Sequence, residues 1–154
     1  MSAKLTHTEL AFPDGIYQLV HTMCCLHPIH ISLGIYYEMY LCAFMGMVLF
    51  GTSLNYWRNP VIPSFARNMD MICAFTIVFY YYYLSLYTTN KIVCIGFNTT
   101  GMIMYPISLH LQHNYKYIRS AALCHCLIHM CVGLSVCFTY RDYYEQGHSL
   151  KWNL

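Results

Sequence analysis

Four stretches of the sequence are about 20 residues long and almost entirely apolar, and they restrict the possible folds more than any other feature. They cover about residues 31–53, 65–87, 92–111 and 117–140. A helix of about 20 residues crosses the hydrocarbon core of a bilayer, with its backbone hydrogen bonds made internally. The sequence therefore predicts an all-α integral membrane protein, a bundle of about four transmembrane helices joined by short connections.

The composition agrees with this prediction. Of the 154 residues, 58% are hydrophobic and only 9% are charged, whereas a soluble domain carries about a quarter charged residues. So small a chain cannot bury that much apolar surface in its own core. We expect one multi-pass domain over residues 1–154, with the lipid bilayer and other membrane subunits as its partners. A net charge of +2 is too small to indicate nucleic-acid binding, and the sequence leaves open which membrane is involved.

The segment over residues 15–30 is also apolar, but it contains a proline, Pro28. The residues from 16 to 53 are too few for two full spans and a turn. We therefore predict an amphipathic N-terminal helix, interfacial or half-inserted, that ends at Pro28 because proline cannot continue the hydrogen-bond ladder.

Glu38 is the one acidic residue of the first predicted span, and its nearest candidate partners are His27 and His30. A buried Glu–His pair could relay protons, whereas a neutral Glu could simply bond a neighbouring helix. Both interpretations stay open. The nine cysteines lie mostly within the apolar stretches and are expected to be free, buried thiols, with a metal knuckle as the alternative.

Polar residues within the spans are the candidates for function, because polar groups are costly in lipid. Ser53 closes the first span, and Asp70 lies about one turn into the second. His110 ends the third span, while His125 and His129 lie four residues apart near the start of the fourth, on one side of their helix. Antiparallel spans would bring all five residues to a similar depth near one face of the membrane.

Such a set could perform zinc chemistry. His125 and His129 make half of a zinc site, and His110 is the candidate third ligand. Asp70 could deprotonate a metal-bound water, and Ser53 could hydrogen-bond a developing oxyanion. The alternative is structural, since histidines in spans also serve as polar contacts between helices.

The order Ser53, Asp70 and His125-x-x-x-His129 resembles the CREST group of membrane hydrolases, which includes alkaline ceramidases, progestin and adipoQ receptors and Per1-like proteins. The resemblance implies zinc-dependent hydrolysis of a lipid amide or ester. Members of that group place a third zinc ligand, a histidine, four residues after the serine, and here that position holds Trp57. The group also has about seven spans, more than this chain has room for.

Three hypotheses for the function follow. The first is a structural or accessory subunit of a membrane assembly. The second is a zinc-dependent lipid hydrolase of CREST type, either active or inactive. The third is a membrane anchor for b-type haem, with His110 and either His125 or His129 as axial ligands.

Overall fold

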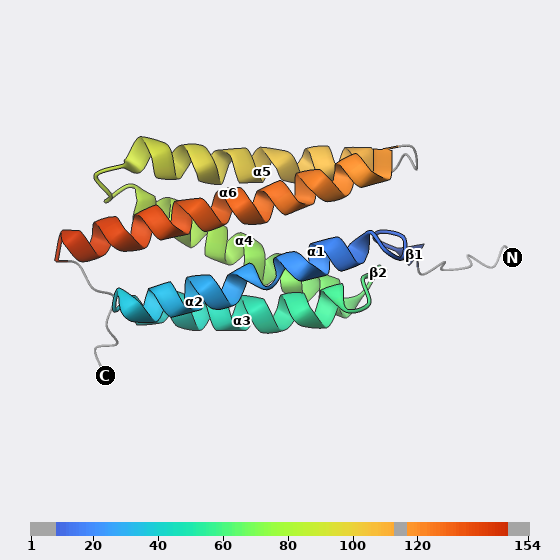
Figure 1. The fold of residues 1–154 in the computed structure, drawn as a ribbon, viewed down its shortest axis with the longest axis horizontal. Coiled ribbons are helices and arrows are strands. Elements are labelled where there is room, and N and C mark those ends of the chain that lie inside the picture. Colours follow the sequence, from blue (N-terminus) through green and yellow to red (C-terminus); the bar gives the residue numbers. More distant parts are fainter. Residues whose placement is uncertain (1–8, 113–116, 148–154) are drawn as a thin grey trace, which may run out of the picture.

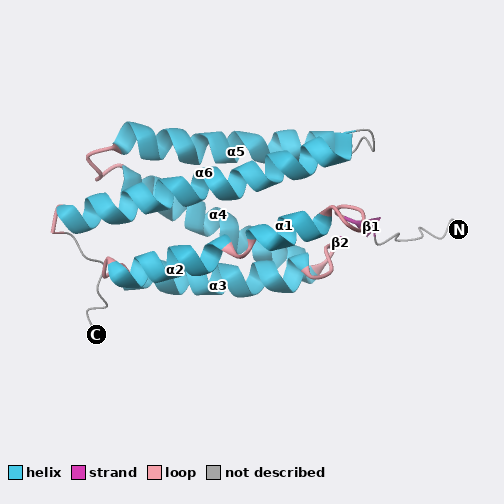
Figure 2. Ribbon diagram, in the orientation of Figure 1, coloured by secondary structure: helices cyan, strands magenta, loops and turns pink. Residues whose placement is uncertain are grey.

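The computed structural model describes residues 9–112 and 117–147. Within these residues it contains six helices and one pair of short strands, joined by short loops (Figure 2). The helices are α1 (Tyr17–Met23), α2 (Leu26–Tyr36), α3 (Tyr40–Trp57), α4 (Phe65–Ser85), α5 (Lys91–Gln112) and α6 (Ile118–Glu145), and the strands are β1 (Glu9–Leu10) and β2 (Val61–Ile62). The prediction of a helical bundle is therefore confirmed.

The helices run roughly along one direction and form two antiparallel pairs (Figure 1). One pair is α5 with α6, which pack together extensively, and the other is α2 with α3. Between the pairs runs α4, which contacts α3, α5 and α6. Helix α1 lies in line with α2 and packs against α3 and α6, so the N-terminal part of the chain belongs to the bundle.

Three segments are long and apolar enough to cross a membrane: residues 17–36, formed by α1 and α2, together with α5 and α6. The last two coincide with predicted spans. Helix α4 begins at the predicted residue, Phe65, because the Ser64 side chain caps it by accepting a hydrogen bond from the Arg67 amide at 3.1 Å. Large apolar side chains such as Phe65 (80% exposed) and Ile92 (82% exposed) point outward. The fold is thus compatible with a membrane protein, on the basis of three candidate spans.

The prediction of one helix over residues 31–53 is wrong, because the chain reverses between Tyr36 and Tyr40. Helix α2 ends in a Schellman motif, in which the Met39 amide donates to the Gly34 carbonyl and the Glu38 amide donates to the Ile35 carbonyl. Glu38 holds the left-handed position of this motif, with φ of 57°. Glycine usually occupies that position, so the sequence carries no obvious sign of the turn.

The predicted N-terminal helix over residues 15–30 does not end at Pro28, because α2 continues to Tyr36. Pro28 lies in the first turn of α2, where the backbone amides need no partner within the helix, so proline is tolerated there. Val20 and Cys24 are fully buried against the rest of the bundle. The pairing of α2 with α3 is close, because a Cβ atom at Gly34 would lie only 3.1 Å from that of Ala43.

At one end of the bundle the chain forms a strap, residues 9–12, which folds back over the helices. Strand β1 pairs antiparallel with β2, the Ala11 amide donates to the Pro60 carbonyl at 2.7 Å, and the Gln112 side chain donates to the Ala11 carbonyl. These bonds place the Phe12 side chain in the core, where it is 2% exposed. The nine cysteines are all free, as predicted.

Candidate functional site

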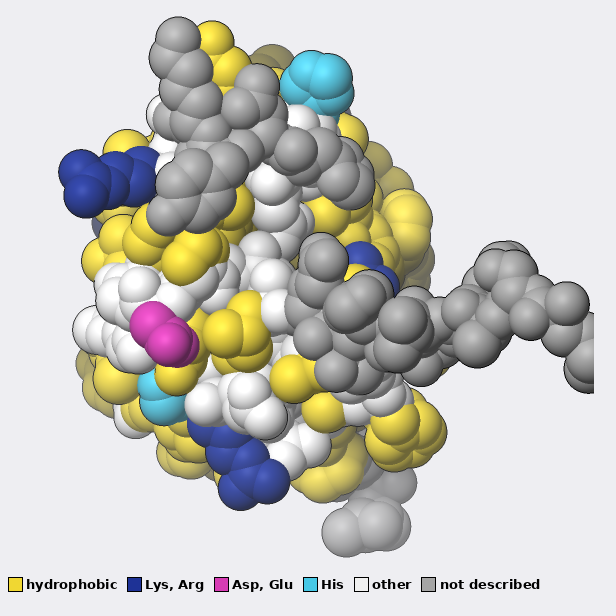
Figure 3. Space-filling view, turned by 90° about the vertical axis from the view of Figure 1, so that its right-hand side faces the viewer, with side chains coloured by type: hydrophobic (Ala, Val, Ile, Leu, Met, Phe, Trp, Pro, Cys, Tyr) yellow, Lys and Arg dark blue, Asp and Glu magenta, His cyan; other side chains and the backbone are white. Residues whose placement is uncertain are grey.

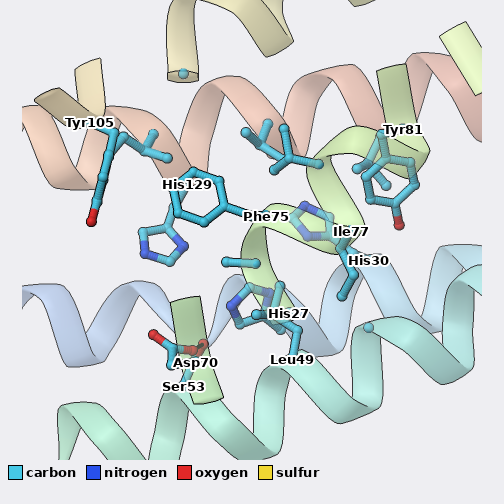
Figure 4. Close-up of a pocket in the computed structure, with 18 of the residues that line it drawn as sticks. His27, His30, Leu49, Ser53, Asp70, Phe75, Ile77, Tyr81, Tyr105 and His129 are labelled. Atoms are coloured by element: carbon cyan, nitrogen blue, oxygen red, sulfur yellow. Dashed lines mark hydrogen bonds between the residues drawn. The ribbon is translucent and has the colours of Figure 1, made fainter. Parts of the chain in front are cut away.

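A cavity of about 140 Å³ lies within the bundle and is lined by residues of α2, α3, α4, α5 and α6 (Figure 4). Most of its wall is apolar, with Leu49, Ala74, Ile77, Val78, Val132 and Val136 among the lining residues. Its polar lining residues include Ser53, Asp70, His27, His30, His125 and His129. Ionisable side chains thus gather in an otherwise apolar interior, which is the usual composition of a binding site.

Helical periodicity explains how these side chains come to share one cavity. On α6 the lining residues His125, His129, Val132 and Val136 follow a spacing of four, three and four. On α4 the lining residues start at Asp70 and continue one turn later at Ala74. Residues spaced by three or four lie on one face of a helix, so each helix presents a single stripe to the cavity.

Ser53 and Asp70 form the closest polar contact of the cavity. The Ser53 hydroxyl donates to Asp70 Oδ1 at 2.5 Å, and the Thr52 hydroxyl lies 3.5 Å from the same oxygen. Ser53 is 2% exposed and Asp70 is 8% exposed. Among the residues that the structure describes, no donor lies within hydrogen-bonding distance of Asp70 Oδ2. This oxygen is therefore available to a bound molecule.

Four imidazoles gather beside this pair. The ring centroids of His125 and His129 are 5.3 Å apart, those of His27 and His129 are 5.6 Å apart, and those of His27 and His30 are 6.3 Å apart. Figure 4 shows His27 and His30 extending from α2 toward His129 on α6. His27 is 8% exposed, and its Nε2 atom is buried without a hydrogen-bond partner in the described part of the chain.

Aromatic side chains close the end of the cavity that lies under the strap. The Trp57 ring packs against His125, with centroids 4.8 Å apart, and Phe12 stacks on Trp57 at 6.0 Å. The resemblance to the CREST group predicts a histidine as third zinc ligand at this position, whereas the chain has Trp57, and an indole cannot bind zinc. The residue that differs from the CREST pattern, Trp57, therefore lies directly beside His125, one of the two candidate zinc ligands.

A second, smaller cavity of about 60 Å³ adjoins the first at this end. Trp57, Asp70, Met71, Tyr105 and His125 line both cavities. The smaller one is also lined by residues of the strap, by Tyr56 and by Arg67. Among the described residues that line it, Arg67 is the one basic side chain with a permanent charge.

Four of the five predicted site residues, Ser53, Asp70, His125 and His129, line the central cavity. His110 does not line it and is exposed. Ser108 faces α6, where its hydroxyl donates to the Ala121 carbonyl at 2.8 Å. His110 follows two residues later, about 200° further around the helix, so it points away. The zinc set and the haem ligand pairs that include His110 are therefore not formed.

His27 and His30 were not predicted to line the site. The sequence suggested them instead as partners of Glu38. Glu38 lies in the turn that follows α2, eleven residues after His27, or about 16 Å along a helix. The spacing of three between His27 and His30 places both on one face of α2. That signal becomes informative only once α2 is known to lie inside the bundle.

The side chains as they stand do not form the zinc site that the resemblance implies. The described residues contain no group of three His, Cys, Asp or Glu side chains arranged to hold a metal ion. His125 and His129 supply two neighbouring imidazoles, but Trp57 stands where a third would be expected. Comparisons of the chain with protein-family models, curated proteins and solved structures found no match. Function therefore has to be argued from the geometry of the site.

Proposed function

We propose that this chain is an accessory membrane protein that crosses the bilayer several times and binds a lipid molecule in its central cavity. The observation that carries the proposal is the cavity itself, in which buried polar side chains meet at one end of a largely apolar space. As a subunit of a larger assembly, the protein would hold this lipid as a structural or regulatory component.

The shape and lining of the cavity favour an amphiphilic ligand. Along α4 the lining residues extend from Asp70 to Tyr81, about 16 Å at the helical rise per residue. The polar pair Ser53–Asp70 lies at one end, and apolar side chains such as Ile77 and Val136 lie toward the other. A molecule with a polar group and an aliphatic chain would match both ends.

The unpartnered imidazole nitrogen also favours a ligand. A buried polar atom without a hydrogen bond costs about 1–3 kcal/mol, and native proteins rarely leave one unsatisfied. The His27 Nε2 atom is buried in this way beside the cavity. A polar atom of a bound lipid, or a water held beside it, would supply the missing hydrogen bond.

The test is to fill the cavity and measure whether the lipid is lost. Ala74 lines the cavity, so Ala74→Phe should occupy the space of the ligand. The matched control is Ile72→Phe on the same helix. Ile72 is 61% exposed, so a larger apolar side chain there extends outward and does not enter the cavity. Native mass spectrometry of the 154-residue chain in mild detergent would report the bound lipid.

The expected result is a lipid adduct in the wild type and in Ile72→Phe, and its loss in Ala74→Phe. Circular dichroism should show the same helix content in all three proteins. An adduct that persists in Ala74→Phe, or a wild-type protein that carries no lipid at all, would refute the proposal.

A second candidate function is hydrolysis of CREST type. The specific observation in its favour is that Ser53, Asp70, His125 and His129 line one cavity. Metal analysis of the purified chain tests it: a zinc hydrolase should carry about one zinc per chain and lose it in His125→Ala. The variant Trp57→His adds an imidazole beside His125 and should bind zinc if the resemblance reflects common geometry. No zinc in either protein would remove this candidate.

A further inference from the structure

We propose that the smaller cavity binds the headgroup of a phosphatidylethanolamine-type lipid, with its ammonium group at Asp70 and its phosphate at Arg67. This inference rests on the proposed function and names the class of lipid. It derives from three features of the smaller cavity: its place in the bundle, its pair of opposite charges and its aromatic lining.

The smaller cavity lies where a lipid headgroup would lie. It is bounded by the strap and by the ends of the long helices, since its lining residues include Phe12, Arg67 in the first turn of α4, and Gln112 at the end of α5. Figure 3 views this end of the molecule, where basic side chains are scattered among hydrophobic ones. Such a mixture is typical of the interface between lipid and water.

Arg67 supplies the site for the phosphate. Its guanidinium lies beside the hydroxyl groups of Tyr56 and Tyr105, and it is half-buried. Among the side chains that the structure describes, those of residues 10–112 and 117–147, no carboxylate lies within ion-pair distance of it. A guanidinium presents a planar set of donors that matches phosphate oxygens, so a phosphate would complete its surroundings.

Asp70 and the aromatic rings supply the site for the ammonium group. Asp70 Oδ1 is bonded to Ser53, which leaves Oδ2 to accept a hydrogen bond from a ligand. Phe12, Tyr56, Trp57 and Tyr105 line the same small cavity. Aromatic faces attract cations, most strongly where water is excluded, and a carboxylate among them adds a charge-assisted hydrogen bond.

The two charged residues of the smaller cavity are close in the chain but do not pair with each other. Arg67 and Asp70 are three residues apart on α4, about 4.5 Å along its axis, yet the structure shows no ion pair between them within its described residues. The volume of about 60 Å³ holds about four to six water-sized groups. That is enough for the O–C–C–N atoms of the ethanolammonium part, with the phosphate at its Arg67 edge, and too little for three further methyl groups.

The experiment compares lipids that differ only in the headgroup. The 154-residue chain in detergent is offered phosphatidylethanolamine, its N-acetylated derivative or phosphatidylglycerol with identical acyl chains. Apparent affinities are measured by native mass spectrometry. We expect phosphatidylethanolamine to bind about tenfold more tightly than the other two. Arg67→Gln and Asp70→Asn should each lower that affinity about tenfold. The exposed Arg119 lines neither cavity, so Arg119→Gln is the matched control and should bind as the wild type does.

Equal binding of the three lipids, or unchanged affinity in both cavity variants, would overturn the inference. If Arg67→Gln failed to fold by circular dichroism, Arg67→Lys would replace it, and its affinity should fall between those of the wild type and Asp70→Asn. Tight binding of soluble phosphoethanolamine without a lipid chain would also overturn it. If a lipid of any headgroup is retained and Ala74→Phe still removes it, the proposed function stands while this inference fails. Absence of any lipid refutes both.

Discussion

Gly133 on α6 gives a demanding test of the cavity geometry, because the His30 imidazole packs directly against it. A Cβ atom added at Gly133 would lie 2.7 Å from both Cε1 and Nε2 of His30, a distance that real Cβ atoms essentially never show. In Gly133→Ala, either His30 must rotate into the cavity or α2 must move away from α6.

Two opposing contributions set the change in the free energy of unfolding of Gly133→Ala. Replacing glycine by alanine inside a helix stabilises it by about 0.5–1 kcal/mol. Forcing an extra methyl group into a packed interior costs about 1–3 kcal/mol. Gly96 lies inside α5, and a Cβ atom there meets nothing within 4 Å. Gly96→Ala therefore shows only the gain in helix stability. We therefore expect Gly133→Ala to be less stable than Gly96→Ala by about 1–3 kcal/mol.

The assay is thermal unfolding of the purified chain in detergent, followed by circular dichroism. A double-mutant cycle with His30→Ala assigns the cause, because removing the imidazole removes the clash. In the His30→Ala background, Gly133→Ala should no longer lower the unfolding midpoint. Equal midpoints for Gly133→Ala and Gly96→Ala, or a loss that persists without His30, would refute the assignment of His30 to this position.

Three further predictions concern stability, each measured by unfolding in the same detergent. Asp142 is 4% exposed and accepts hydrogen bonds at 2.6 Å and 2.9 Å from the loop between α4 and α5, so Asp142→Ala should cost about 2–4 kcal/mol. Glu38 has a positive φ, so Glu38→Gly should be more stable than Glu38→Ala by about 1 kcal/mol. The buried hydroxyl groups of Tyr81 and Tyr140 are 2.6 Å apart, so Tyr81→Phe should cost about 1–2 kcal/mol, and Tyr140→Phe added to it should cost little more.

Each of these predictions has a comparison that isolates its cause. Asp142→Asn keeps acceptor capacity and should lose less stability than Asp142→Ala, whereas equal losses would contradict the role of its hydrogen bonds. Both Glu38 variants lack the carboxylate, so a difference in stability between them reports the backbone conformation alone. Equal stability of the two variants would count against the left-handed conformation at residue 38. Additive losses at Tyr81 and Tyr140 would show that the two hydroxyls do not depend on each other.

Much of the fold could be predicted because hydrophobicity along the chain is a local property. The stretches predicted over residues 65–87, 92–111 and 117–140 became α4, α5 and α6, and of these α5 and α6 are long and apolar enough to cross a membrane. The turn at Glu38 could not be found in this way. It depends on a Schellman motif without glycine and on the close packing of Gly34 against Ala43, a contact between two helices.

The candidate site, too, could be predicted from the sequence only in part. Ser53, Asp70, His125 and His129 were predicted to come together from their positions along the helices, and these four residues do line one cavity. His110 was predicted with them, but it points away from the cavity and is exposed. His27 joined the site only because the N-terminal segment packs inside the bundle.

By itself, the sequence determined which segments are helical and how far along each helix its polar residues lie, because every residue adds the same rise of about 1.5 Å. The tertiary structure alone decided which imidazoles meet. The rotation of a helix about its axis is set by the side chains that pack between helices, and those contacts join residues far apart in the chain. His110 is the residue for which that rotation changed the outcome, since it is exposed and does not line the cavity.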